Sequence, residues 1–265
     1  MLSSAMENPQ LLLKPGTLHR AATLASEHAH TCGALQPIDT RIDFVDDDGV
    51  RFVLRILTEQ RAPKPRSDSA MVERARNNPF LPHDPNLFVA DISSTHLCLL
   101  NKYTVIANHL LLVTRDFEHQ EQWLTLADFE ALCACMAEFE GLAFYNGGTT
   151  AGASQPHKHL QYVPFPMVKF GENIPLSTKL VRARAGQITT TLALPFKHAF
   201  YRFESDAWQD WQRHSRNRFA RYVEMLAATG IDPRGIASGT QQTCGYNLLA
   251  TRQWMLLVPR KRDQY

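Results

Sequence analysis

The stretch Gly152-Ala-Ser-Gln-Pro-His-Lys-His-Leu-Gln161 joins a turn of small residues to three alternating polar side chains. In an extended chain, successive side chains point to opposite faces, so His157, His159 and Gln161 are expected to share one face of a strand. The glycines of residues 146–154 permit positive φ, which lets the N–H groups of this loop converge on a phosphate. A glycine-rich turn alone is common. Its coupling to a His-x-His-x-Gln strand indicates histidine chemistry on a phosphate group.

The chemistry follows from the properties of imidazole. Its unperturbed pKa is about 6.5, so near neutral pH it is mainly an uncharged nucleophile that needs no base to remove a proton. Attack on an α-phosphorus would give a nucleotidyl-histidine and divide one difficult displacement into two easier ones. The rest of the acceleration must come from positioning and from donors aimed at the non-bridging oxygens.

Five segments resemble, in their order along the chain, the diadenosine tetraphosphate phosphorylases, also called ATP adenylyltransferases. This family is a branch of the histidine-triad superfamily close to galactose-1-phosphate uridylyltransferase. The segments are Asn78-Pro-Phe-Leu-Pro82, Leu100-Asn-Lys-Tyr103, His109-Leu-Leu-Leu-Val-Thr-Arg-Asp-Phe117, Gly152 to Gln161, and Trp254-Met-Leu-Leu-Val-Pro-Arg260. The resemblance extends over about residues 77–260, and the first sixty residues match only loosely.

The resemblance implies an α+β fold, built as a histidine-triad-like antiparallel sheet with flanking helices. Residues 1–265 would form one catalytic unit of two pseudo-repeated halves, a catalytic half at 1–165 and a second half at 166–265. The implied reaction is the phosphorolysis of diadenosine tetraphosphate by inorganic phosphate to ATP and ADP, and its reverse. The expected partners are thus diadenosine polyphosphates, ATP, ADP and phosphate, bound by a monomer. A divalent cation, magnesium by resemblance, would accompany the polyphosphate without a preformed metal site.

The family assigns nucleophilic attack to the second histidine, here His159. His157 either assists directly or only holds the turn through a hydrogen bond. Gln161 stands where the superfamily's hydrolases carry a third histidine. A carboxamide can only donate and accept hydrogen bonds, so Gln161 favours transfer over hydrolysis. Lys158 is expected to face away from the site as a solvated surface lysine.

The other candidates are substrate-binding residues. Lys64 matches a lysine that the family uses on substrate phosphates, although a proline-flanked basic loop is often only surface. Asn101 either lies near the ribose or caps a strand end, and Asn146 either binds phosphate or only tolerates a left-handed turn. The α-phosphate region would be held by Gly152, Ala153, Ser154, Gln155 and Gln161, and the distal nucleotide by Met255 and Arg260.

Two other functions remain open. A uridylyltransferase acting on sugar phosphates shares a His-x-His-x-Gln site, although Gly-Ala-Ser-Gln before the histidines and Leu160 resemble the adenylyl branch. The second open function is that of an inactive nucleotide-binding or sensing protein. Members of the resembled family continue past the Pro-Arg of the last strand with a glycine-rich segment, whereas this chain ends at Tyr265. We therefore expect a second half that is shortened at its C-terminus.

The composition is that of an ordinary globular protein. The chain has 265 residues, of which 44% are hydrophobic and 20% are charged. This length is enough for a sizeable core in one or two domains. Its net charge of +2 does not favour nucleic-acid binding. No apolar run approaches the roughly 18 residues of a membrane span, and the N-terminus lacks a signal pattern. We expect a cytoplasmic protein without a membrane partner.

The five cysteines suggest neither a disulfide framework nor a zinc site, because their number is odd and no Cys-x-x-Cys pair occurs. His28, His30 and Cys32 form a local string, but one unconstrained segment rarely supplies three ligands of a tetrahedral site. A solvated helix end is the better interpretation. Cys133 and Cys135 lie in a helical pattern and are expected in or at the edge of the core.

Periodicity and turn residues predict the main elements. Thr125 and Asp128 resemble a capping box that opens a helix closed by Gly141. A further resemblance between residues 99–115 and 247–260, which end in Leu-Leu-Val-Thr-Arg and Leu-Leu-Val-Pro-Arg, predicts an internal repeat of two hairpins. Two unrelated buried hairpins are the alternative. Helices are expected at 17–30, 125–140 and 208–228, and strands at 41–45, 50–57, 97–101, 110–114, 142–145, 157–163, 246–251 and 254–258.

Overall fold

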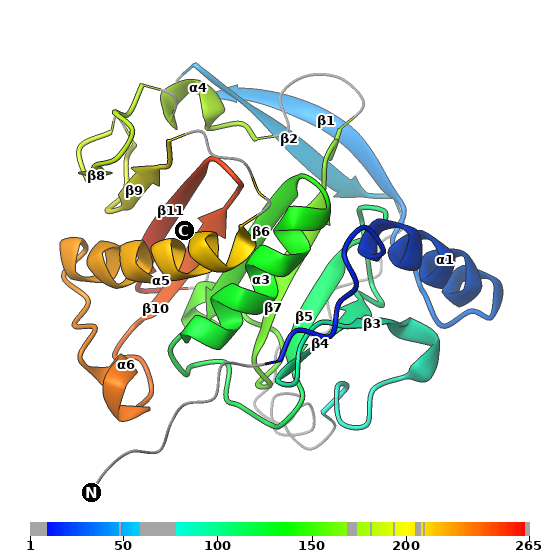
Figure 1. Cartoon of the computed structure of the whole chain (residues 1–265). Coiled ribbons are helices and arrows are strands. Elements are labelled where there is room, and N and C mark those ends of the chain that lie inside the picture. The colour runs from blue at the N-terminus through cyan, green and yellow to red at the C-terminus, as the bar shows by residue number, and fades with distance from the viewer. Residues whose placement is uncertain are drawn as a thin grey trace, which may run out of the picture.

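The computed structural model describes residues 10–47, 49–58, 78–168, 174–180, 182–192, 194–204, 208 and 210–262. Its framework is a nine-stranded antiparallel sheet, accompanied by a separate two-stranded hairpin (Figure 1). The predicted α+β class is therefore confirmed.

The strands of the large sheet lie in the order β3-β4-β5-β7-β6-β10-β11-β9-β8. They are β3 (Phe88–Asp91), β4 (His96–Leu100), β5 (Leu110–Thr114), β6 (Gly141–Gly147), β7 (His159–Pro164), β8 (Ile188–Thr189), β9 (Ala199–Arg202), β10 (Gly245–Ala250) and β11 (Trp254–Arg260). The hairpin pairs β1 (Thr40–Asp47) with β2 (Val50–Leu57). All of these pairings are antiparallel, as the resemblance implies.

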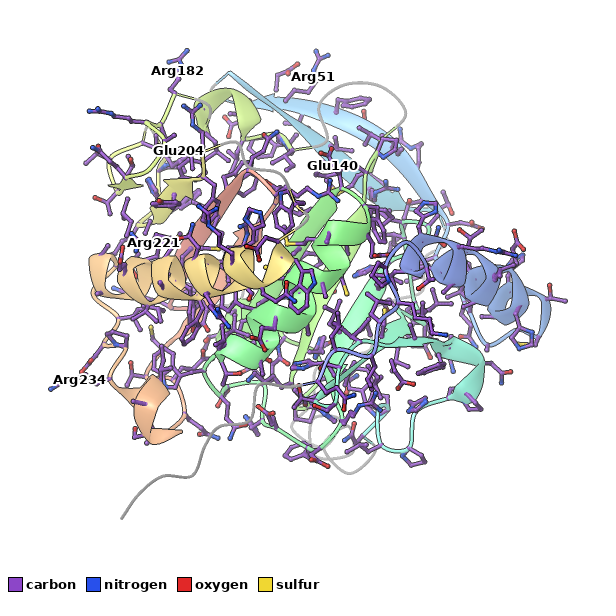
Figure 2. All side chains as sticks on the ribbon, viewed as in Figure 1. Arg51, Glu140, Arg182, Glu204, Arg221 and Arg234 are labelled. Atoms are coloured by element: carbon purple, nitrogen blue, oxygen red, sulfur yellow. The ribbon has the colours of Figure 1, made fainter. Side chains whose placement is uncertain are left out.

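The long helices α1 (Leu18–Thr31), α3 (Leu126–Glu138) and α5 (Trp211–Ala228) lie on one face of the sheet, where α3 and α5 cross in front of it (Figure 1). Short helices are α4 (Ser177–Leu180) and α6 (Gly235–Ser238). Side chains fill the layer between helices and sheet, while charged groups such as Arg51 and Arg234 project from the periphery (Figure 2). None of the helices in the described part of the chain is long and apolar enough to cross a membrane.

Helix α3 begins as its sequence predicts. The Thr125 hydroxyl accepts from the Asp128 N–H, and the Asp128 carboxylate accepts from the Thr125 N–H, which completes the capping box. The helix is buried on most sides, and Cys133 and Cys135 lie fully inside the core, as expected. The predicted end was wrong. Phe139 follows the last helical residue in an extended conformation, and Gly141 begins β6.

The strand order is symmetric about the junction between β6 and β10. Outward from that junction, one half runs β6-β7-β5-β4 and the other β10-β11-β9-β8. Along the chain, β5-α3-β6-β7 corresponds to β9-α5-β10-β11. This topology is what two pseudo-repeated halves would produce, but the matching elements are not those that the sequence suggested. The hairpin β10-β11 occupies the place of β6-β7, whereas the similar Leu-Leu-Val runs lie on β5 and β11, which do not correspond.

Candidate active site

His159 and Gln161 lie on β7, between β5 and β6, near the middle of the sheet. The register places Gln161 beside Phe144 of β6 and Leu111 of β5. Leu160 points the other way, into the core beneath the helices. We call the face that carries His159 and Gln161 the site face. The prediction that these two residues sit on a strand is confirmed, so the sheet holds them rigidly.

The His159 ring is held in one tautomer. The residue is only 6% exposed, and its Nδ1 lies 2.8 Å from the carbonyl oxygen of His157. A carbonyl oxygen only accepts, so Nδ1 carries the proton and donates it in this hydrogen bond. The lone pair is therefore on Nε2, and this is the nitrogen that can attack phosphorus.

The His157 ring is occupied on both nitrogens. Nε2 donates to the Thr114 carbonyl oxygen at 2.9 Å, and Nδ1 lies 2.9 Å from Asn78 Nδ2. The Phe80 N–H donates to Asn78 Oδ1, which turns the Asn78 NH₂ group toward the imidazole. Sequence reasoning placed His157 among the catalytic residues. In the structure both ring nitrogens are engaged and the His157 carbonyl oxygen fixes the tautomer of His159, which favours the alternative that His157 holds the turn.

Gln120 clamps the backbone around His159. Its Oε1 accepts from the His159 N–H at 2.8 Å, and its Nε2 donates to the carbonyl oxygens of Asn146 at 2.8 Å and His159 at 3.2 Å. It thus joins β6 and β7 beyond the last paired residues of these strands. Sequence reasoning missed Gln120, because it lies outside every motif and meets His159 only through the fold.

Lys158 is not a solvated lysine, and that prediction was wrong. Its side chain is 0% exposed, and Nζ lies 2.7 Å from Asp128 and 2.9 Å from Glu118. A third hydrogen bond goes to the Trp123 carbonyl oxygen. The residue does face away from His159, as alternation predicts, but helix α3 covers that face and supplies Asp128. Burial would lower the pKa of Lys158, but the two carboxylates outweigh burial and raise it.

The glycine loop between β6 and β7 is a formed turn. Gly148 and Gly152 have φ of 90° and 88°, a region that favours glycine, and a short 3-10 turn lies between them. A Cβ on Gly148 would also meet the Glu121 side chain at 2.9 Å. Ser154 is exposed, and Gln155 Oε1 is buried without a hydrogen-bond partner in the described part of the chain. Ser154 is therefore accessible to a ligand at the loop, whereas Gln155 carries a buried acceptor without a partner in the described residues.

The second half of the chain holds Asn146. Asn247 of β10 donates through Nδ2 to Asn146 Oδ1 and to the Ala151 carbonyl oxygen, both at 2.8 Å. Arg260 of β11 donates to Asn247 Oδ1 at 2.7 Å. Because Asn146 Oδ1 accepts this bond, its NH₂ group remains to donate to an anion. Arg260 thus supports the loop through Asn247, a residue that sequence reasoning missed for lack of any local signal.

The remaining predicted site residues are scattered. Met255 is fully buried in the core beneath the helices, so the structure removes it from the substrate-binding set. Asn101 hydrogen-bonds to His109 on the site face. Lys64 lies outside the described residues.

No group of three or more His, Cys, Asp or Glu side chains in the described segments is arranged to hold a metal ion. The string of His28, His30 and Cys32 is exposed at the end of α1, as expected.

Burial sets the charge of His159. It lowers the pKa of His159 to about 4, helped by the neighbouring His157 ring and opposed by the hydrogen bond to the His157 carbonyl oxygen. Burial also lowers the pKa of His157. His159 is thus neutral throughout the physiological range, although it lies close to the glycine loop.

Residues 8–182 match the family described as Ap4A phosphorylase N-terminal domain, and residues 192–264 match the ATP adenylyltransferase C-terminal domain. The chain belongs to the Ap4A phosphorylase family. Diadenosine 5',5'''-P1,P4-tetraphosphate phosphorylase 2 of Saccharomyces cerevisiae is 29% identical over 218 residues, 75% of this chain and 66% of that protein. Protein APA1 of the same yeast is 30% identical over 176 residues, 62% of this chain and 54% of that protein. The chain therefore spans less than two thirds of the length of either relative.

Solved structures share the fold. Yeast Ap4A phosphorylase Apa2 in complex with AMP superposes with a TM-score of 0.71 at 24% identity, covering 94% of this chain and 82% of that one. The same enzyme in complex with Ap4A gives a TM-score of 0.71 at 21% identity, covering 95% and 83%. The resemblance inferred from the motifs is confirmed at the level of family and fold.

Proposed function

We propose that this protein is a nucleotidyltransferase that cleaves diadenosine tetraphosphate with inorganic phosphate, and that it forms an adenylyl-His159 intermediate. The observation that supports this most directly is the His159 ring, which is held with its proton on Nδ1 and its lone pair on Nε2. It lies on the same strand face as a carboxamide and next to a preformed glycine turn. The name of the family and that of the yeast tetraphosphate phosphorylase agree with this chemistry.

In the first step, His159 Nε2 attacks the α-phosphorus, a nitrogen–phosphorus bond forms, and the bond from that phosphorus to the bridging oxygen breaks. ATP leaves with the bonding electrons and needs no proton, because a polyphosphate is a stable anion. In the second step, an oxygen of inorganic phosphate attacks the same phosphorus and the nitrogen–phosphorus bond breaks. This releases ADP and restores the neutral imidazole. Both steps are reversible, so the site can also join ADP and ATP.

The remaining candidate residues would bind the phosphates of the substrate and position them for attack. Gln161, Ser154, the Asn146 NH₂ group and the N–H groups of the loop would donate to the non-bridging oxygens at the reacting phosphorus. Lys64 would contact the outer phosphates. A divalent cation, for which we propose magnesium, would arrive with the polyphosphate and neutralise part of its charge.

We also propose that the protein acts as a monomer in the cytoplasm. The nine-stranded sheet already combines both halves within one chain. The five cysteines, all of which the structure describes, are free thiols. Free thiols are typical of a reducing compartment.

The substrate assignment predicts turnover of diadenosine tetraphosphate that requires inorganic phosphate and yields equal amounts of ATP and ADP. Chromatographic product analysis would measure this. Uridine diphosphate-glucose with galactose-1-phosphate is the comparison pair, because a uridylyltransferase would also use a His-x-His-x-Gln site. Turnover of the uridine nucleotide alone would overturn the proposal in favour of that enzyme. Nucleotide binding without turnover of either pair would identify an inactive binding protein.

The lowered pKa of His159 predicts an unusual pH profile for the first chemical step. The neutral ring is the nucleophile, so activity is present above the pKa and is lost as pH falls through it. With a pKa of about 4, the single-turnover rate of adenylyl transfer should stay level from pH 8 down to pH 5 and decline below that. Quenched-flow measurement of labelled protein between pH 8 and pH 4 tests this. Half-loss near pH 6.5, the ordinary value for histidine, would contradict it.

A further inference from the structure

A carboxamide that binds a phosphate must direct its NH₂ group, and not its carbonyl oxygen, toward the phosphate. The NH₂ group of Gln161 attracts a non-bridging oxygen, whereas its carbonyl oxygen repels one. The two ends have almost the same shape, so packing alone does not distinguish them. Some neighbour must accept from or donate to Gln161 to set its orientation, and the site face offers such a neighbour.

Asn101 fixes the tautomer of His109. The Tyr103 N–H donates to Asn101 Oδ1 at 3.3 Å, which turns the Asn101 NH₂ group toward His109. Asn101 Nδ2 lies 3.2 Å from His109 Nδ1, and the Asn101 N–H donates to the His109 carbonyl oxygen at 2.8 Å. Because an NH₂ group only donates, His109 Nδ1 accepts. The His109 proton is therefore on Nε2.

His109 is placed beside Gln161. It immediately precedes β5, in which Leu111 pairs with Gln161 and Leu110 with Tyr162. Alternation puts His109 on the site face, one diagonal step from Gln161. Diagonal neighbours are typically about 7–8 Å apart, which is within reach of long side chains. The residue is 9% exposed, and Nε2 makes no hydrogen bond of normal geometry within the described part of the chain.

The charge state of His109 fits this arrangement. Burial lowers the pKa of His109 to about 4, Gln161 opposes this shift through its side chain, and His159 adds to it. His109 is therefore neutral near pH 7, carries one N–H on Nε2, and adds no positive charge beside His159.

We propose that Asn101 and His109 are positioning residues that orient Gln161. His109 Nε2–H donates to Gln161 Oε1, and this turns the Gln161 NH₂ group toward the phosphate oxygen at His159. The relay runs from the Tyr103 N–H through Asn101 and His109 to Gln161. It rests on the proposed nucleotidyl transfer at His159, and it gives Asn101 a role in the relay in place of a ribose contact.

A double-mutant cycle tests the relay. His109→Phe keeps an aromatic ring but removes the donor, and should lower the single-turnover rate of adenylyl transfer by about 30-fold, a little less than loss of a whole oxyanion donor. In a Gln161→Ala background the same change should lower the rate by no more than about 2-fold, because its target is gone. An unchanged rate in the single variant, or equal losses in both backgrounds, would overturn the relay.

A second variant reads the tautomer directly. Asn101→Asp replaces the donor by an acceptor, so His109 should move its proton to Nδ1, and Gln161 should then turn its carbonyl oxygen toward the phosphate. ¹⁵N NMR of labelled histidine should show His109 protonated on Nε2 in the unaltered protein and on Nδ1 in Asn101→Asp, with a similar loss of rate. Protonation on Nδ1 in the unaltered protein would overturn the proposal.

The chain supplies a matched control. His198 immediately precedes β9, the strand that corresponds to β5, and it is also buried with Nε2 lacking a hydrogen-bond partner in the described residues. Its half of the sheet carries no His-x-His-x-Gln segment. His198→Phe should therefore leave the rate of adenylyl transfer unchanged, and an equal loss would show a packing effect and overturn the relay. Absence of labelling in the unaltered protein would overturn the proposed function itself, whereas labelling at an unchanged rate in His109→Phe overturns only the relay.

Discussion

His159→Ala is expected to abolish the adenylyl-protein. With adenine-labelled diadenosine tetraphosphate and no inorganic phosphate, the unaltered protein should stop at the intermediate and retain label after denaturation. The bond should be acid-labile and base-stable, as a phosphoramidate is. Turnover by His159→Ala should fall by about 10⁴-fold or more, the range seen when a covalent nucleophile is removed. Scintillation counting of denatured protein and steady-state assay of ATP release provide the two measurements.

The control for this experiment is His28→Ala. His28 is an exposed histidine at the end of α1, and its loss should leave both labelling and turnover unchanged. Binding of the nucleotide to His159→Ala should persist, since the loop donors remain, and calorimetric titration can check this. Label retained by His159→Ala at the unaltered level would refute the assignment of the nucleophile.

Lys158→Met is expected to lower the free energy of unfolding by about 3–5 kcal/mol, the usual cost of leaving one member of a buried ion pair uncompensated. Asp128 would lose its hydrogen bond from Lys158 and keep those with His96 and the start of α3. Burial alone would raise the pKa of Asp128, but Lys158 and His96 outweigh it and hold that pKa well below its usual range. Urea denaturation followed by circular dichroism measures the loss.

Two further variants distinguish the stability contribution of the buried Lys158–Asp128 ion pair from that of an ordinary surface charge. Glu118, which also contacts Lys158, is 40% exposed on its side chain, so Glu118→Gln should cost at most about 1 kcal/mol. Asp128→Asn added to Lys158→Met should recover part of the stability, because the orphaned charge is removed. A loss below about 1 kcal/mol in Lys158→Met would mean that the ammonium group reaches water in solution.

Local signals explain the predictions that succeeded. The capping box of Thr125 and Asp128 acts within one helical turn, and the strands on either side of Gly49 are joined by a short turn, so both are visible in a window of a few residues. The same holds for the alternation of His159 and Gln161. The end of α3 was placed too late, because Phe139 leaves the helix two residues before the glycine that was expected to stop it.

Non-local pairing explains the predictions that failed. The alternation of side chains along a strand predicts which face of the sheet Lys158 and Met255 lie on. It does not predict whether a helix packs against that face. Helix α3 supplies Asp128 to Lys158, and the helical layer encloses Met255. Two similar apolar runs predict an internal repeat of two hairpins, but the order of the strands depends on which strand edges pair. In the observed order, the hairpin β10-β11 of the second half takes the place that β6-β7 has in the first half.

The sequence by itself determined the family, the α+β class and the strand that carries His159 and Gln161, because these depend on residue type and short-range spacing. The tertiary structure alone decided which nitrogen of His159 carries the proton and which residues hold the ring. Gln120, Asn78, Asn247 and His109 reach the site from separate parts of the chain. Their hydrogen bonds exist only once β5, β6, β7 and β10 lie side by side, since donor and acceptor directions within a site follow from the packing of strands.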